Sequence, residues 1–222
     1  MRISLTLERS YSNDLSIMVD ALRASATITT ALQSFNIIRP VKDIKDAVEL
    51  AKELNAILAG ERDGAKIEGF DVGNSPLDIK ELGGDVLVLT TTNGTRILES
   101  MSAKVLIGSF LNASAVAQRA VELARNHIEI VMAGVNGKFV IEDFLGAGEI
   151  ISHLKDHELD EMAQAALMAS SDKYMVDKAV KNSQSAVKLG ALGLGKDVQY
   201  SLKRNIYNTV PIYKDGIIKA LK

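Results

Sequence analysis

The sequence of 222 residues contains no cysteine and no tryptophan, and it has only three histidines. Without cysteine the chain cannot form disulfides, iron–sulfur clusters, thiolate zinc sites or a cysteine nucleophile. Aromatic residues make up only 5% of the chain, which leaves few rings on which bases or sugars could stack. Any chemistry must therefore depend mainly on oxygen ligands, arginine and lysine.

An excess of charge of one sign is also lacking, because 26 Lys and Arg stand against 28 Asp and Glu, for a formal net charge of -2. This balance argues against a nucleic-acid partner. No apolar run approaches the length of a membrane span, and the first residues lack the apolar region of a signal peptide. We therefore expect a cytoplasmic protein with no membrane partner; a homo-oligomer is compatible with the sequence.

Short β-branched runs alternate with helix-like segments over the first 135 residues. The predicted strands are Ile3–Leu7, Ser16–Val19, Ile57–Ala59, Asp85–Leu89, Lys104–Ile107 and Glu129–Met132. The predicted helices between them are Ala24–Ser34, Ile44–Leu54 and Ala113–Arg125. This alternation predicts βαβ units and an α/β fold with a mainly parallel sheet.

The remainder of the chain is richer in helical patterns. The predicted helices there are Glu142–Leu154, Glu161–Ala169 and Ser183–Leu192. A closing segment, Thr209–Leu221, is typical of a hairpin or of a strand, turn and helix. We predict a main α/β subdomain over residues 1–135 and a helix-rich second subdomain over residues 136–222, forming one functional unit.

Polar residues follow most of the predicted strands. They are Asp20, Gly60–Arg62, Thr90–Arg96, Ser109 and Asn112. If the strands are parallel, these groups meet at the carboxyl edge of the sheet, where open α/β sheets bind ligands. The sequence therefore predicts a polar site at that edge.

Each of these segments has two interpretations. Thr90–Arg96 could bind an anion at a helix start, or its hydroxyls could only cap the helix. Asp20 and Arg23 could hold a cation and an anion, or could form a local ion pair. Glu142 and Asp143 could be ligands, or could favour the helix dipole. The long segment between residues 60 and 78 predicts a functional lid.

Several segments together, in order along nearly the whole chain, carry a resemblance to a known family. They are Val19–Ala24, Gly60–Arg62, Glu68–Pro76, Thr90–Arg96, Gly108–Ala113, Gly134 with Gly137, Glu142 with Asp143, Asp197, and Val210 with Pro211. These segments resemble the 2-phosphosulfolactate phosphatase (ComB) family. Ala21 stands where the family more commonly has valine.

The resemblance implies a three-layer α/β/α fold and a magnesium-dependent phosphatase that converts 2-phosphosulfolactate to 3-sulfolactate, a step towards coenzyme M. Asp20, Arg23, Glu61 and Asp71 would be catalytic, and Mg²⁺ would be held by Asp20 with one or more of Glu61, Asp71, Glu142 and Asp143. The expected substrate-binding residues are Arg62, Asn74, Ser75, Thr91, Thr92, Asn93, Gly94, Thr95, Arg96, Ser109 and Asn112.

Three alternatives stay open at this point. Water could attack the phosphoryl group directly, or Asp20 could form an acyl-phosphate. The substrate could be another small anionic phosphate ester, because a family resemblance does not fix the substrate. The chain could also be a protein that binds a phosphorylated or sulfonated metabolite without hydrolysing it.

Overall fold

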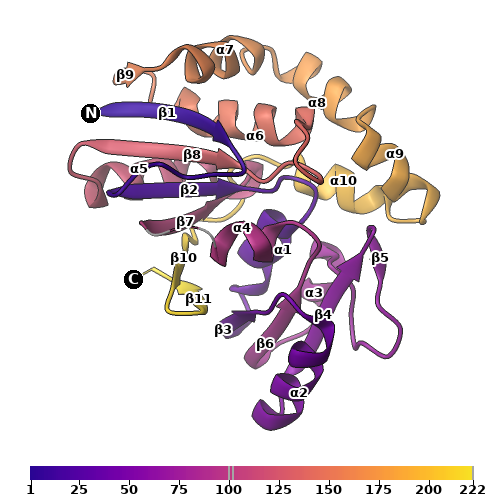
Figure 1. Cartoon of the computed structure of the whole chain (residues 1–222). Helices are drawn as coiled ribbons and strands as arrows, with labels where there is room; N and C mark the ends of the chain where they lie inside the picture. Colours follow the sequence, from indigo (N-terminus) through magenta and orange to yellow (C-terminus); the bar gives the residue numbers. More distant parts are fainter. Residues whose placement is uncertain (100, 102, 222) are drawn as a thin grey trace.

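The computed structural model describes residues 1–99, 101 and 103–221, apart from the side chains of Thr95, Arg96 and Glu99. The described residues form an 11-stranded sheet in the order β5-β4-β6-β3-β11-β10-β7-β2-β8-β1-β9 (Figure 1). The strands are β1 (Arg2–Leu7), β2 (Leu15–Val19), β3 (Phe35–Pro40), β4 (Ile57–Arg62), β5 (Ala65–Lys66), β6 (Gly84–Thr90), β7 (Lys104–Gly108), β8 (His127–Met132), β9 (Glu158–Leu159), β10 (Pro211–Lys214) and β11 (Ile217–Ala220).

Two blocks of parallel strands make up most of the sheet. The first block contains β1, β2, β7 and β8, and the second contains β3, β4 and β6. The hairpin of β10 and β11 joins them, because β10 pairs antiparallel with β7 and β11 pairs antiparallel with β3. The two blocks consequently run in opposite senses across the sheet. The sheet is mixed and mostly parallel, which confirms the predicted fold class.

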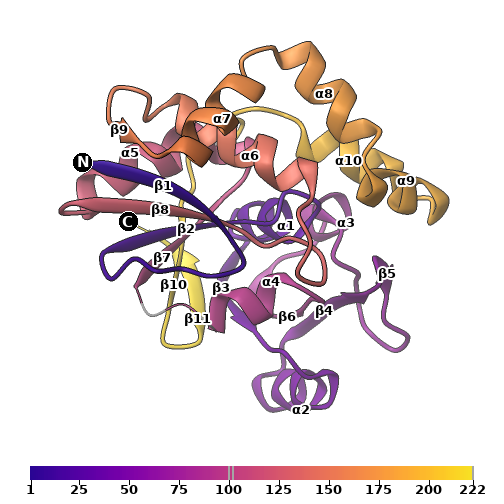
Figure 2. The same ribbon diagram turned by 45° about the horizontal axis from the view of Figure 1, so that its top comes forward.

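Helices cover both faces of the sheet (Figures 1 and 2). They are α1 (Ala24–Ala31), α2 (Ile44–Leu54), α3 (Pro76–Lys80), α4 (Gly94–Glu99), α5 (Ala113–Leu123), α6 (Ile141–Ser152), α7 (Glu161–Ala169), α8 (Lys173–Lys181), α9 (Gln184–Ala191) and α10 (Gly195–Ser201). Ile17 of β2 packs into a hydrophobic cluster with residues of α5 and α6, whereas the next residue, Met18, packs into a cluster with residues of α1 and α3. This alternation along one strand produces the three-layer α/β/α arrangement.

All six predicted strands and all six predicted helices are present, with ends that differ by a few residues. The strand β3 was missed, because Asn36 and Arg39 interrupt its apolar run and Pro40 ends it. The helix α8 was missed as well, although the Asp172 carboxylate accepts hydrogen bonds from the N–H groups of Tyr174 and Met175. An acidic residue directly before a helical segment is a recognisable start signal.

The closing segment is a hairpin, which decides between the two predicted alternatives. Its two strands belong to the same sheet as the strands of residues 1–135, so the sheet crosses the predicted subdomain boundary. That division of the chain stays a prediction. None of the helices in the described residues is long and apolar enough to cross a membrane.

The segment between residues 60 and 78 is structured rather than a simple loop. It contains the turn from β4 into β5, a bridge between Ala59 and Val72, and the start of α3. The Ser75 hydroxyl accepts a hydrogen bond from the Asp78 N–H and so caps α3. Phe70 and Val72 are buried, which fixes the segment against the sheet.

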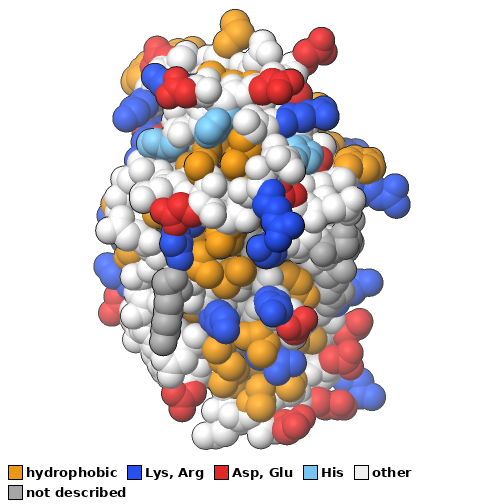
Figure 3. Space-filling view, turned by 90° about the vertical axis from the view of Figure 1, so that its left-hand side faces the viewer, with side chains coloured by type: hydrophobic (Ala, Val, Ile, Leu, Met, Phe, Trp, Pro, Cys, Tyr) orange, Lys and Arg blue, Asp and Glu red, His pale blue; other side chains and the backbone are white. Residues whose placement is uncertain are grey.

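Acidic and basic side chains are interspersed over the described part of the face at the left of Figure 1, with hydrophobic side chains between them (Figure 3). It is the side of the molecule on which β1 begins (Figure 1). Several Lys and Arg side chains lie around the hydrophobic side chains in the middle of this face (Figure 3). The acidic groups described next are instead concentrated within a pocket.

Candidate active site

A pocket lies where the chain leaves β2, β4, β6 and β8 and meets α9. It contains about 700 Å³ of space, part of it open to solvent. The two parallel blocks each contribute the ends of two strands, and β4 and β6 are steeply inclined to β2 and β8 in Figure 1. The lining residues are Asp20, Leu22, Arg23, Glu61, Asp63, Gly64, Asn74, Thr92, Asn93, Gly134, Val135, Asn136, Val140, Glu142, Asp143, Ser185, Lys188 and Leu189.

Asp20 stands directly after β2, and only 9% of the residue is exposed. One carboxylate oxygen, Oδ1, accepts a long hydrogen bond of 3.3 Å from the Ala24 N–H at the start of α1. Burial raises the pKa of Asp20 from 3.8 to about 7, and the charges of Glu61 and Glu142 add to this effect. The folded chain therefore favours protonated Asp20 unless a cation is close by.

Glu61 and Asp143 are also buried, but backbone groups occupy both oxygens of each carboxylate. Glu61 accepts from the N–H groups of Gly64 and Thr92, at 2.7 and 2.6 Å. Asp143 accepts from the N–H groups of Ala21 and Gly134, at 2.8 and 2.9 Å. Burial, followed by the charge of Asp20, raises the pKa of Asp143 well above its usual value. These two carboxylates fasten the turns that surround the pocket.

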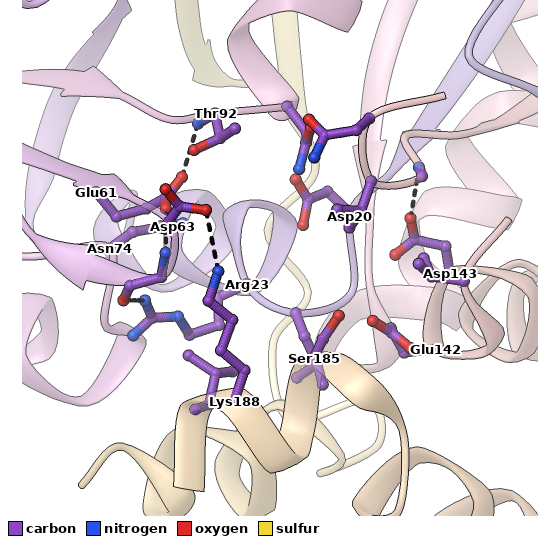
Figure 4. Close-up of a pocket in the computed structure, with 18 residues that line it drawn as sticks. Asp20, Arg23, Glu61, Asp63, Asn74, Thr92, Glu142, Asp143, Ser185 and Lys188 are labelled. Atoms are coloured by element: carbon purple, nitrogen blue, oxygen red, sulfur yellow. Dashed lines mark hydrogen bonds and ion pairs between the residues drawn. The ribbon is translucent and has the colours of Figure 1, made fainter. Parts of the chain in front are cut away.

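Glu142 differs from the other buried acids. It lies in the first turn of α6, is 2% exposed and lines the pocket, and no hydrogen bond to its carboxylate is found among the residues that the structure describes. Figure 4 shows Glu142 and Asp20 projecting into the same cavity. A carboxylate can accept about four hydrogen bonds, so oxygens with few protein donors can take water or a ligand instead. Among the buried acids in the described pocket lining, Glu142 and Asp20 accept the fewest hydrogen bonds from the protein and have the most acceptor capacity left for a ligand.

The Arg23 side chain is held by a buried ion pair. Its Nη1 lies 2.7 Å from Oδ2 of Asp197, and the two side chains are 2% and 3% exposed. The other oxygen of Asp197 accepts from the Ser75 hydroxyl at 2.8 Å, and Arg23 Nη2 donates to the carbonyl oxygen of Gly64 at 2.6 Å. The guanidinium group therefore has a fixed position in the pocket wall.

Two polar atoms of the pocket wall are buried without a hydrogen-bond partner in the described residues, Oδ1 of Asn74 and Oγ1 of Thr92. A buried polar atom without a partner is destabilising unless something outside the protein satisfies it. The hydroxyl of Thr92 can donate or accept, and so can the amide of Asn74 through its two polar atoms. The Thr92 hydroxyl can therefore donate to an oxygen atom of a bound anion, whereas Oδ1 of Asn74, which only accepts, suits a hydrogen-bond donor or a cation.

The structure brings together most of the predicted acids but leaves Asp71 outside the pocket wall. Asp71 is exposed, and its Oδ2 accepts a hydrogen bond from the Leu58 N–H at 2.8 Å. Among the described residues, no group of three acidic or histidine side chains converges closely enough to hold a metal ion on its own. Any cation here would need ligands from water or substrate besides the carboxylates.

The predicted substrate-binding residues divide into two sets. Asn74, Thr92 and Asn93 line the pocket. Gly94 lies beside Asp20, because a Cβ placed on Gly94 would come within 3.3 Å of Asp20 Oδ2. The side chains of Thr95 and Arg96 lie outside the described part of the chain.

The other predicted residues lie behind the pocket wall. Arg62 donates to the carbonyl oxygens of Glu61 and Lys42 and to the Thr90 hydroxyl. Ser109 and Asn112 form a buried capping box, and the Asn112 amide donates to the carbonyl oxygen of Thr209. Thr91 is buried as well. These residues shape the loops around the pocket without lining it.

Sequence reasoning missed the contribution of α9, which presents Ser185, Lys188 and Leu189 to the pocket (Figure 4). It also missed Asp63, in the turn after β4. The three residues of α9 lie far from the strand ends in the sequence, and the pattern of α9 is that of an ordinary amphipathic helix. Asp63 directly follows β4, so its place after a strand was the available signal. Asp197 belongs to the motifs that carry the family resemblance, which was the available signal for the Arg23 partner.

The fold and the pocket together define an α/β protein with a buried acidic site. Residues 2–216 match the family described as 2-phosphosulpholactate phosphatase. The chain is similar to the 2-phosphosulfolactate phosphatase of Methanothermobacter thermautotrophicus, with 52% identity over 100% of this chain and 96% of the relative. It is also similar to the 2-phosphosulfolactate phosphatase of Methanocaldococcus jannaschii, with 40% identity over 94% of this chain and 93% of the relative. The chain belongs to the 2-phosphosulfolactate phosphatase family, a family of phosphoric monoester hydrolases.

Proposed function

We propose that this protein is a magnesium-dependent phosphatase that hydrolyses 2-phosphosulfolactate to 3-sulfolactate and phosphate, as a step of coenzyme M biosynthesis. The family and the two named relatives support the reaction. The acidic pocket supports the metal dependence, because a substrate carrying several negative charges cannot approach buried carboxylates without a compensating cation.

The observation that carries the proposal is the pair of Asp20 and Glu142, which face one cavity with acceptor capacity to spare. Mg²⁺ prefers oxygen ligands and is commonly held by one or two carboxylates, with waters and phosphate oxygens completing the set. The donor chemistry therefore fits, even though three acids do not converge. When bound by Asp20 and Glu142, the ion would polarise the phosphoryl group and neutralise developing charge.

The remaining pocket residues bind and orient the substrate in this proposal. Arg23 lines the pocket with a guanidinium group that Asp197 and Gly64 fix in place, so little side-chain entropy remains to be lost when it contacts an oxyanion. Thr92 would donate its buried hydroxyl to an oxygen atom of the substrate, and Oδ1 of Asn74 would accept from a hydroxyl or water at the same site. Glu61 and Asp143 hold the surrounding turns in position, because they accept hydrogen bonds from backbone N–H groups of those turns.

The decisive experiment measures phosphate release from 2-phosphosulfolactate with Mg²⁺ and with a chelator. We expect hydrolysis only with Mg²⁺, and a loss of roughly 10²- to 10³-fold in kcat/KM for Asp20→Asn, the equivalent of several kcal/mol. Activity that survives chelation, or an unchanged Asp20→Asn variant, would contradict the proposal.

The variant Asp71→Asn tests whether Asp71 is a metal ligand, as the sequence predicts, or has only a structural role outside the pocket wall. If Asp71 serves only to accept from the Leu58 N–H, asparagine can replace it and activity is retained. If Asp71 is a metal ligand, the variant requires more Mg²⁺ for half-maximal activity. Measuring activity against Mg²⁺ concentration for Asp71→Asn and for the unmodified protein distinguishes these outcomes.

The proposal includes a small anionic phosphate ester as substrate, a cytoplasmic location, and no nucleic-acid or membrane partner. Relative rates on a panel of phosphorylated hydroxy acids test the substrate, and 2-phosphosulfolactate should give the highest kcat/KM. Sedimentation of the purified protein determines whether it is a homo-oligomer. If another ester gives a higher kcat/KM than 2-phosphosulfolactate, the proposed substrate is wrong, but the proposed reaction, hydrolysis of a phosphate ester, is retained.

A further inference from the structure

One wall of the pocket comes from α9, which follows α8 in the helix-rich part of the chain. Ser185, Lys188 and Leu189 are three and four residues apart, so they occupy the same face of the helix. All three line the pocket. In Figure 4, Ser185 lies near Glu142, and Lys188 extends towards Asp63. Lys188 is therefore positioned to contact a part of a substrate that extends away from Asp20 and Glu142.

Lys188 reaches across the rim of the pocket to Asp63. Its Nζ lies 3.0 Å from Oδ1 of Asp63, in the turn between β4 and β5, and the side chains are 54% and 89% exposed. An ion pair this exposed contributes little to stability, because water competes for both charges and two side chains must be ordered. The pair can consequently separate at little cost when another anion becomes available to Lys188.

The charges of the pocket wall make Lys188 the exchangeable cation. The described lining residues include the acids Asp20, Glu61, Asp63, Glu142 and Asp143, but only two bases, Arg23 and Lys188. Arg23 is committed to a buried pair with Asp197 and to the carbonyl oxygen of Gly64. Lys188 is the base whose partner is an exposed carboxylate. A substrate with an anionic group in addition to its phosphate needs such a cation.

We propose that Lys188 is a specificity-determining residue that leaves Asp63 and binds the second anionic group of the substrate, its sulfonate or its carboxylate. This inference rests on the phosphatase function proposed above. Lys188 then selects phosphate esters with a charged tail over esters with an uncharged tail. Asp63 holds the ammonium group over the pocket when no substrate is present and competes with the substrate for it.

The first test replaces Lys188 by methionine, which keeps the apolar stem of the side chain and removes the charge. The substrates are 2-phosphosulfolactate, 2-phospholactate with only a carboxylate, 2-sulfoethyl phosphate with only a sulfonate, and propyl phosphate with neither. We expect the preference for 2-phosphosulfolactate over propyl phosphate, measured as the ratio of kcat/KM, to fall about 10-fold or more, because hydrogen bonds to charged groups are strong. The single-anion ester that loses more identifies the group bound.

Lys181→Met is the matched control, since Lys181 is an exposed lysine at the end of the neighbouring α8 and does not line the pocket. Its preference ratio should equal that of the unmodified protein. A Lys188→Met variant that loses equally on all four esters, or on none, would overturn the inference.

The second test, Asp63→Asn, has the opposite expected sign. The variant removes the competitor of the substrate, so KM for 2-phosphosulfolactate should fall about 2- to 5-fold while kcat stays within 2-fold. If the ion pair served only to hold α9 against the β4–β5 turn, both variants would raise KM. Effects of the same sign in Lys188→Met and Asp63→Asn therefore contradict the proposed role.

The outcomes also separate this inference from the proposed function. If the unmodified protein hydrolyses all four esters with similar kcat/KM, the phosphatase function stands and the role of Lys188 fails. If it hydrolyses none, the proposed function fails. The role of Lys188 in binding the anionic group is then tested separately, by calorimetric binding of 3-sulfolactate. A dissociation constant about 10-fold higher in Lys188→Met supports the inference, whereas equal or undetectable binding refutes it.

Discussion

Replacing Asp20 by asparagine should make the metal-free protein more stable, although it should also inactivate it. Asp20 is buried, and burial together with the charges of Glu61 and Glu142 raises its pKa from 3.8 to about 7. Asparagine has nearly the same shape, carries no charge and can still accept the hydrogen bond from the Ala24 N–H. The substitution thus removes the electrostatic penalty while it preserves most local contacts.

The size of the effect depends on pH. Below pH 3.8 the carboxyl group is protonated in both states and contributes no penalty. As the pH rises from 3.8 to about 7, the unfolded chain releases a proton that the folded chain retains, so the folded state loses stability; above pH 7 the loss is complete. A difference of about 3 in pKa corresponds to roughly 4 kcal/mol. For a chain of this size, that free energy equals a rise in Tm of about 8–16 °C.

Urea unfolding of both proteins, with a chelator present, at pH 4, 6 and 8 measures this effect. The stability difference between Asp20→Asn and the unmodified protein should be near zero at pH 4 and largest at pH 8. Asp85→Asn serves as the control, because Asp85 is exposed and its carboxylate accepts a hydrogen bond from the Asn36 side chain, which an asparagine can also accept. A difference that does not change with pH, or a variant that is less stable at pH 8, would refute the electrostatic reasoning.

Further predictions concern binding and stability. Mg²⁺ should raise Tm more at pH 8 than at pH 5.5, because protons compete for Asp20, and Glu142→Gln should remove most of this shift in a thermal scan. Asp197→Asn should cost about 3–5 kcal/mol in urea unfolding, since it breaks a buried pair, whereas Glu49→Gln in an exposed pair should cost under about 1 kcal/mol. Gly60→Ala should cost about 1–3 kcal/mol, because its Cβ would lie 2.7 Å from Thr90 atoms, whereas Gly190→Ala, with no atom within 4 Å, should be neutral or stabilising.

The strands could be predicted because burial on both faces leaves a continuous apolar run. Ile17 and Met18 illustrate this, since neighbouring residues of one strand face two different hydrophobic clusters. The strand β3 lacked such a run, because Asn36 and Arg39 interrupt it. Its place in the sheet depends on pairing with β6 and β11, which are distant in the sequence.

The buried acids of the pocket were predictable, because each follows a predicted strand or begins a predicted helix. What could not be predicted is how their hydrogen-bonding capacity is divided. Each carboxylate oxygen of Glu61 and Asp143 accepts a hydrogen bond from a backbone N–H, whereas no such bond to Glu142 is found among the described residues. This difference depends on how turns meet in space. For the same reason, Lys188 entered the site only through the packing of α9.

The strands β10 and β11 come after all of the other strands in the sequence, but they lie in the middle of the sheet, between β7 and β3. The ribosome therefore synthesises these central strands after the strands on either side of them. Until residues 211–220 emerge, β7 and β3 each present an edge of unpaired backbone groups, and such edges readily recruit other chains. The pairing of Ile218 with Ile38 then closes one of the longest loops in the molecule, which slows folding. The cell that makes this protein must therefore keep the edges of β3 and β7 from pairing with other chains until β10 and β11 have been synthesised.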